Sequence, residues 1–230
     1  MSREKLISTT TVVASVCILL SVQFISCCSA AEEETKNSGM VVNVQTAFAE
    51  HEVVPDVVDA APKELLKVTY PSGVSANGGE ELTPTQVKDQ PKLEWSADPN
   101  AFYTLFMVDP DAPNRQEPKF RSVCHWYVGN IPGDKIEQGD HRIAFVGSGP
   151  PQGSGLHRYV FLVYKQPDGR VDLSEAPRTS NRSRNNRLNF QHKDYVKKYN
   201  LSELVAGNFY RAQFDDYVPT LHAQLSSGTE

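Results

Sequence analysis

Three short segments of this 230-residue chain contain side chains that bind small charged groups. Residues 109–113 (DPDAP) hold Asp109 and Asp111 in a turn that two prolines make stiff. His125 and His157 each lie within an apolar run. Imidazole groups donate hydrogen bonds to anions, and a carboxylate accepts them from an ammonium group. These residue types therefore suit the recognition of a phosphate or carboxylate that has an amine nearby.

A glycine-rich segment lies between the two histidines, at residues 147–155 (GSGPPQGSG). Glycine has no Cβ atom, so the backbone N–H groups of such a segment can face a bound anion. The segment lacks the Lys-Ser/Thr pair and the following helix of a nucleotide-binding phosphate loop, which excludes that class of site. The alternative interpretation is a mobile hairpin linker, which the consecutive Pro150 and Pro151 disfavour.

Each of these motifs has an ordinary interpretation when it is taken alone. Asp and Pro are common in plain turns, and a histidine in an apolar run is more often a core residue than a ligand. Binding requires the segments to meet, and each of them begins or ends an expected strand. Tyr159 follows His157 by two residues, which places both on one face of a strand. We therefore expect a cavity between strand ends, lined by Asp109, His125, His157, Tyr159 and glycine amides.

Hydrophobic patterns predict the elements that position these residues. Apolar, β-prone runs bounded by Pro, Gly, Asp or Asn predict strands over residues 67–70, 92–95, 102–108, 123–128 and 157–164. Their spacing favours sheets packed face to face. Apolar residues recur at helical spacing within residues 193–205 alone. Residues 178–187, rich in Asn, Ser and Arg, are expected to form an exposed loop whose basic charge is solvated.

The N-terminal 30 residues have the pattern of a secretory signal peptide. Arg3 and Lys5 precede an apolar run over residues 12–25, and small residues follow at positions 28–31. An uncleaved anchor helix is the alternative, but it needs about 20 consecutive apolar residues, more than this run provides. We therefore expect residues 1–30 to be a cleaved signal peptide and the protein to be secreted.

The remaining chain is expected to contain a flexible segment over residues 31–50 and one domain over residues 51–230. Cleavage would leave Cys124 as the one cysteine, so a hydrophobic core rather than disulfides would hold the domain together. Cys124 lies among apolar residues and is expected to be a buried small hydrophobe. The net charge of −5 and the shortage of basic runs make nucleic acid an unlikely partner class on electrostatic grounds.

Two long motifs resemble the phosphatidylethanolamine-binding protein family, also called Raf kinase inhibitor proteins. They are DPDAP at residues 109–113 with the CHW strand at 124–126, and GSGPPQGSGLHRY at residues 147–159. Shorter matches lie at residues 82–87, 180–183 and 215–219, so the resemblance covers residues 55–226. It implies an antiparallel β-sandwich with a large central sheet, a smaller second sheet and short helices near the C-terminus.

The resemblance also implies which residues line a pocket for phosphate-like head groups. Asp111 is expected to support that pocket, and a cis Ala112–Pro113 bond fits the sharp turn. Vertebrate-type members have other residues where this chain has Phe120, Val123 and Cys124, so we expect a more apolar pocket wall here. The implied pocket residues are Asp109, Pro113, His125, Gly149, Pro151, His157, Tyr159 and Tyr217.

Three functions are compatible with these features. The first is a secreted, monomeric binding protein for phospholipid head groups or related anionic ligands, without metal or cofactor. The second is a serine protease inhibitor or signalling modulator that acts through a protein–protein surface. The third is a hydrolase, which is the least supported, because no strand-to-helix elbow holds Ser148 against a base. We therefore expect a non-enzymatic protein.

Overall fold

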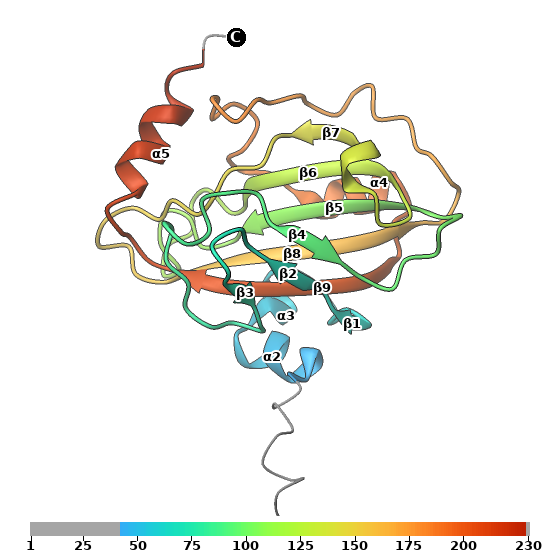
Figure 1. Cartoon of the computed structure of the whole chain (residues 1–230), viewed down its shortest axis with the longest axis horizontal. Helices are drawn as coiled ribbons and strands as arrows, with labels where there is room; N and C mark the ends of the chain where they lie inside the picture. The colour runs from blue at the N-terminus through green and yellow to red at the C-terminus, as the bar shows by residue number, and fades with distance from the viewer. Residues whose placement is uncertain (1–41, 229–230) are drawn as a thin grey trace, which may run out of the picture. The chain divides into compact units, whose positions relative to one another are not determined.

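A six-stranded sheet is built around two long apolar strands, β5 (Phe102–Asp109) and β8 (His157–Gln166). The computed structural model describes residues 42–228. The strand order is β1-β9-β8-β5-β6-β7 (Figure 1). The other strands of this sheet are β1 (Glu64–Leu65), β6 (Val123–Pro132), β7 (Asp140–Ile143) and β9 (Glu203–Ala212). Because β1 pairs with β9 in parallel, the sheet is mixed, and the prediction of a purely antiparallel sheet is wrong.

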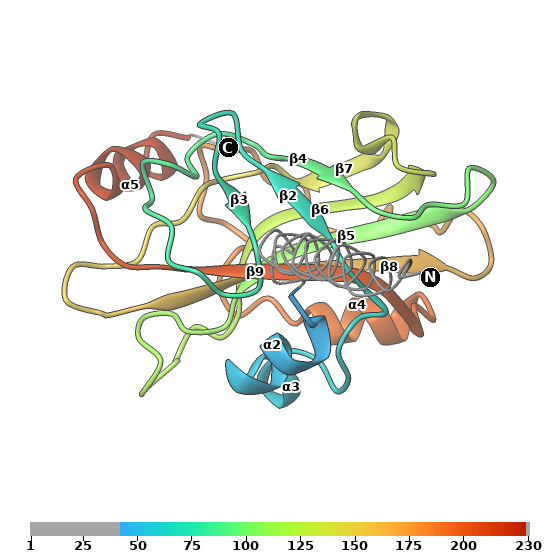
Figure 2. The ribbon, with the colours of Figure 1, turned by 60° about the horizontal axis from the view of Figure 1, so that its bottom comes forward.

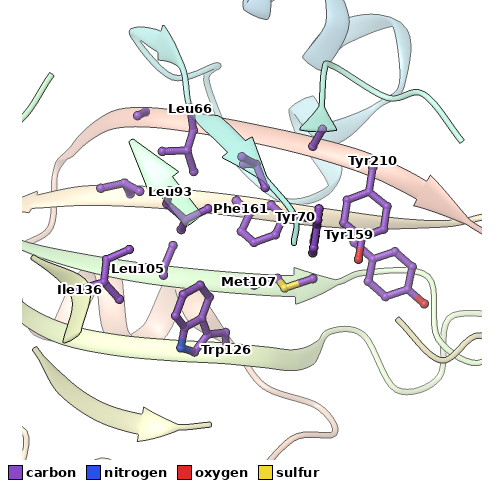
Figure 3. Packing of buried hydrophobic residues seen from close by; sticks show 14 of the residues in the cluster. Leu66, Tyr70, Leu93, Leu105, Met107, Trp126, Ile136, Tyr159, Phe161 and Tyr210 are labelled. Carbon is purple, nitrogen blue, oxygen red and sulfur yellow. The ribbon is translucent and has the colours of Figure 1, made fainter. Parts of the chain in front are cut away.

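A second, three-stranded antiparallel sheet packs against one face of the large sheet. Its order is β3-β2-β4, from β2 (Lys67–Thr69), β3 (Ser75–Ala76) and β4 (Lys92–Glu94). Leu93 of β4 shares one hydrophobic cluster with Leu105 and Trp126 of the large sheet (Figure 3). This contact confirms the prediction of a large sheet with a smaller one.

Helices cover the opposite face of the large sheet (Figure 2). Phe48 of α2 (Val44–Glu50) and Tyr195 of α4 (His192–Lys198) pack in one cluster with Phe106 and Leu162. Since alternate residues of a strand point to opposite faces, β5 and β8 are buried on both sides, as their continuous apolar runs predict. The remaining helices are α3 (Val53–Asp56), the 3-10 turn η1 (Ile136–Gln138) and α5 (Val218–Leu225).

The domain begins earlier than the sequence predicts. The compact unit starts at Val42, and α2 buries Val44 and Phe48 while the side chain of Asn43 caps its N-terminus. The prediction of a flexible segment up to residue 50 is therefore wrong for residues 44–50. The rest of that segment and the predicted signal peptide lie outside the described residues. Among residues 42–228, none of the helices has the length and apolar character that crossing a bilayer requires.

Strand β9 was not predicted, and the helix predicted over residues 193–205 ends at Lys198. Gly207 and Asn208 interrupt the β pattern of this strand, although both have packing reasons. A Cβ atom on Gly207 would lie 3.0 Å from the carbonyl oxygen of Phe161. The buried amide of Asn208 donates to the carbonyls of Leu66 and Ala76 at 2.7 and 2.8 Å, which ties the large sheet to the small one. Tertiary contacts thus require two residues that are typical of turns.

Candidate functional site

Three strand ends meet at one edge of the large sheet. β5 ends at Asp109, which pairs with Val123 at the start of β6, and β8 begins at His157 on the other side of β5. A cavity of about 220 Å³ lies at this edge. Helix α5 lies at the same end of the sheet (Figure 1), and its Leu221 lines the cavity. The expected convergence of strand ends on one cavity is what the structure shows.

Seven of the nine residues predicted for the site line this cavity. They are Asp109, Pro113, His125, Gly149, Pro151, His157 and Tyr159. Tyr217 is not among the lining residues; it is half-buried at the N-cap of α5, where the negative charges of Asp89 and Asp215 surround it. The other lining residues include Phe120 and Val123, which make part of the wall apolar. The Ala112–Pro113 bond is cis, as expected.

Asp109 and His157 form a buried pair. Oδ2 of Asp109 lies 2.8 Å from Nδ1 of His157, and its Oδ1 accepts a hydrogen bond from the backbone N–H of Asp111 at 2.7 Å. Burial would lower the pKa of His157, but the hydrogen bond and the charge of Asp109 outweigh it and raise that pKa. The pair therefore favours an imidazolium beside a carboxylate.

The direction of the next hydrogen bond agrees with this charge state. The hydroxyl of Ser154 donates to the carbonyl of Pro151 at 2.7 Å, because a carbonyl oxygen only accepts. Nε2 of His157 lies 3.0 Å from that same hydroxyl oxygen, so Nε2 is the donor in this contact. Both ring nitrogens of His157 then carry hydrogens.

His125 has the opposite character. Its Nδ1 lies 3.1 Å from the carbonyl oxygens of both Val146 and Gly147, so Nδ1 carries the hydrogen. Burial is the main cause that lowers the pKa of His125, and the ring is neutral at pH 7. In this tautomer Nε2 keeps its lone pair and is available as a hydrogen-bond acceptor. The ring edge packs against Tyr159, with 5.1 Å between the ring centroids.

Buried hydroxyl groups lie next to the two histidines. Tyr159 is fully buried; the backbone N–H of Gly149 is directed at its hydroxyl oxygen, and within residues 42–228 no acceptor is found for its hydroxyl hydrogen. Its ring stacks on that of Tyr210 at 5.2 Å (Figure 3), and the buried hydroxyl of Tyr210 interacts with those of Ser148 and Tyr70. A buried hydroxyl hydrogen without an acceptor costs free energy.

Asp111 lies behind the cavity rather than in its wall. Its carboxylate is fully buried and accepts hydrogen bonds from the backbone N–H, Nε and Nη2 of Arg158 at 2.9, 2.9 and 2.6 Å. The guanidinium of Arg158 also binds Asp56 and the carbonyl of Glu52. Burial tends to raise the pKa of Asp111, but Arg158 outweighs it and lowers that pKa. Asp111 thus anchors the turn to α3, which agrees with its expected supporting role.

Arg187 is a pocket residue that the sequence did not reveal. It is 2% exposed, and its guanidinium donates to five backbone carbonyls, those of Cys124, His125, Ala144, Ser180 and Ser183. The prediction of a solvated basic loop is therefore wrong at this position. Burial lowers the pKa of Arg187 to about 10, so the group remains charged at neutral pH. Within the described residues no carboxylate forms an ion pair with Arg187.

Helix α5 covers the outer side of the cavity. Leu221, His222 and Leu225 line it, and a ring nitrogen of His222 donates to the carbonyl of Gly149 at 3.0 Å. A Cβ atom on Gly149 would lie 2.9 Å from Cδ2 of Leu221, so glycine permits this close approach. The sequence carries a signal for this helix, because Val218, Leu221 and Leu225 recur at helical spacing and Pro219 lies in the first turn.

Comparisons with known proteins agree with this architecture. A family model described as phosphatidylethanolamine-binding protein matches residues 59–210. The chain belongs to this family. A Drosophila melanogaster relative named "Putative odorant-binding protein A5" is 39% identical over 188 residues, which cover 82% of this chain and 89% of the fly protein.

Two solved structures are also similar to this chain. The solution structure of CG7054 is 46% identical, with a TM-score of 0.62 over 76% of this chain and 99% of that one. Carboxypeptidase Y inhibitor, solved in complex with its cognate proteinase, is 24% identical, with a TM-score of 0.64 over 79% of this chain and 100% of that one. The second likeness shows the fold alone.

Proposed function

We propose that this protein is a secreted binding protein whose pocket takes a small anionic head group, with phosphorylethanolamine as the reference ligand. The observation that carries the proposal is the buried guanidinium of Arg187 at the cavity wall. Its hydrogen-bond donors are occupied by carbonyls, so it acts through its charge. A buried cation without a carboxylate partner favours an anion in the adjacent cavity, where the low dielectric strengthens the attraction.

The cavity also holds acceptors, which suits a head group that has both signs of charge. The hydroxyl of Tyr159 is free to donate to a phosphate oxygen. Asp109 and the Nε2 lone pair of His125 accept from an ammonium group. The volume of about 220 Å³ is below the roughly 300–1,000 Å³ of pockets for drug-sized ligands, so a head group fits and a whole lipid does not.

We propose further that the site binds without catalysing a reaction. Ser154, His157 and Asp109 are linked in the order of a catalytic triad, but the hydrogen bonds run in the wrong direction. A general base needs a lone pair on Nε2 to accept the serine proton. Here Nε2 donates to Ser154 while the serine hydroxyl donates to Pro151. Ser148 does not serve instead, since it is fully buried.

Isothermal titration calorimetry with phosphorylethanolamine tests the binding function. The variant Tyr159→Phe removes the unpaired hydroxyl and leaves the ring in place. A hydrogen bond to a charged group contributes about 1.5–3 kcal/mol, so affinity should fall by about tenfold to a hundredfold. The matched control is Tyr127→Phe, because Tyr127 also has a buried, unpaired hydroxyl but lies in the cluster on the opposite sheet face.

A loss of phosphorylethanolamine affinity in Tyr159→Phe alone, with equal thermal stability of both variants, supports binding in the pocket. Equal affinity of both variants, or no binding by the wild type, rejects it.

A second candidate function is protease inhibition through a protein–protein surface. The observation that favours it is the shared fold with carboxypeptidase Y inhibitor. Incubation with serine proteases and with carboxypeptidase Y tests it. Slowing of either protease by micromolar protein supports this function, and unchanged rates reject it.

Secretion rests on the leader pattern of residues 1–30. Expression in a secretory cell line, followed by N-terminal mass spectrometry of the culture medium, tests it. Protein in the medium that begins near residue 31 supports secretion. Protein retained in the cells with Met1 intact contradicts it.

A further inference from the structure

Two large apolar side chains stand exposed at the mouth of the pocket. Phe120 is 40% exposed and Leu188 is 47% exposed, and within residues 42–228 these are the two exposed large apolar side chains. Both line the cavity. Scattered exposed apolar residues are normal on a protein surface, but both of these lie at one binding site. Their position favours an apolar ligand group at the mouth of the pocket.

Backbone hydrogen bonds hold these two residues beside each other. The N–H of Asn189 donates to the carbonyl of Phe120 at 3.3 Å, and the N–H of Cys124 donates to the carbonyl of Arg187 at 2.8 Å. Residues 120–124 and 187–190 therefore run side by side as a paired rim. These hydrogen bonds fix the position of both segments beside the cavity.

Leu188 also lines a second, open groove that continues away from the pocket. Pro177, Phe190 and Tyr195 form the apolar part of this groove. The rings of Phe190 and Tyr195 are stacked, with centroids 4.9 Å apart. Polar residues line the rest of this groove, among them Asn186, Gln191, Asp194 and Lys198. Because Leu188 lines both the head-group cavity and the groove, it connects the apolar surfaces of the two.

We propose that this path binds the hydrocarbon chain of a single-chain amphiphile whose charged head lies in the pocket. The inference rests on the proposed function, since the head group sets the position of the chain. The cationic Arg187 within the cavity favours the anionic head, and the exposed Phe120 and Leu188 favour the chain just outside it. The polar residues that line the groove limit the gain to a short chain.

Calorimetry with phosphorylethanolamine and its butyl, hexyl and octyl monoesters, kept below micelle concentrations, tests the inference. An open groove covers one side of the chain, so each added methylene that contacts its apolar residues should raise affinity about twofold. Leu188→Gln should remove most of this chain-length gain, measured within that variant as the ratio of its affinity for the octyl ester to its affinity for phosphorylethanolamine. Val74→Gln, at a partly buried apolar position that lines neither the cavity nor the groove, is the control.

The outcomes separate this inference from the proposed function. If no ligand binds, including phosphorylethanolamine, the proposed function fails. If phosphorylethanolamine binds but the esters gain nothing, or gain equally in Leu188→Gln, the chain path is wrong. A gain that occurs solely with phosphatidylethanolamine vesicles also contradicts the path, because it would indicate docking on a bilayer.

Discussion

Oδ2 of Asp109 lies 2.8 Å from Nδ1 of His157, although 48 positions separate the two residues in the sequence. The antiparallel pairing of β5 with β8 brings the end of one strand beside the start of the other. This pair sets the charge state of one cavity wall, because Asp109 holds a proton on His157 that burial alone would remove.

The raised pKa of His157 predicts a loss of stability at high pH. The folded state binds the proton more tightly than the unfolded chain, so the stabilisation is fully present below about pH 6.5 and is lost as pH rises through the folded pKa. Urea unfolding at a series of pH values measures how the free energy of unfolding changes with pH, which is the slope in question. Asp109→Asn should flatten it; an unchanged slope in that variant would show that Asp109 does not hold the proton.

The buried His192 predicts a second pH dependence of stability, at acidic pH. Burial and the charge of Lys193 lower its pKa from 6.5 to about 4. The unfolded chain then binds the proton more tightly, so stability should fall by roughly 3 kcal/mol as pH drops between those values. In the same unfolding experiment, the variant His192→Leu should not show this drop in stability at acidic pH. A variant with the same acid slope as the wild type contradicts the assignment.

The buried pair of Asp111 and Arg158 predicts a stability effect without a binding effect. Asp111→Asn leaves Arg158 without its buried carboxylate and should destabilise the fold by about 3–5 kcal/mol. Exposed Asp168→Asn should have little effect on the free energy of unfolding. Below its melting temperature Asp111→Asn should bind phosphorylethanolamine as the wild type does. If the variant is folded but has lost affinity, Asp111 contacts the ligand directly instead.

The hydrogen-bond direction at Ser154 predicts an unreactive hydroxyl. A fluorophosphonate probe should label Ser154 no faster than the exposed Ser180, measured by peptide mass spectrometry at neutral pH. Selective labelling of Ser154 that disappears in His157→Gln would reverse the non-enzymatic proposal.

The sequence predicted the parts of the fold that local patterns encode. β5, β6 and β8 have long apolar runs, and each lies where it was expected. β9 escaped prediction because Gly207 and Asn208 serve contacts with segments far away in the chain. The parallel pairing of β1 also leaves no local pattern, since a two-residue strand is too short for one.

The residues that line the cavity were predicted where they belong to recognisable motifs and were missed where the tertiary structure changes their environment. His125, His157 and Tyr159 lie in regular strands, so their faces follow from strand geometry. Arg187 lies in a segment typical of an exposed loop, and its burial depends on carbonyls from several other segments. Cys124 is buried as expected, and burial raises the pKa of its thiol to about 12.

An NMR titration of the isotope-labelled protein with phosphorylethanolamine tests the central claim most directly. If the head group enters the cavity, amide shifts should concentrate in residues 147–155, around His125 and in α5, and should saturate together at one affinity. Shifts that are absent, or that gather around exposed lysines and arginines away from the cavity, would contradict a head-group pocket at this edge of the sheet.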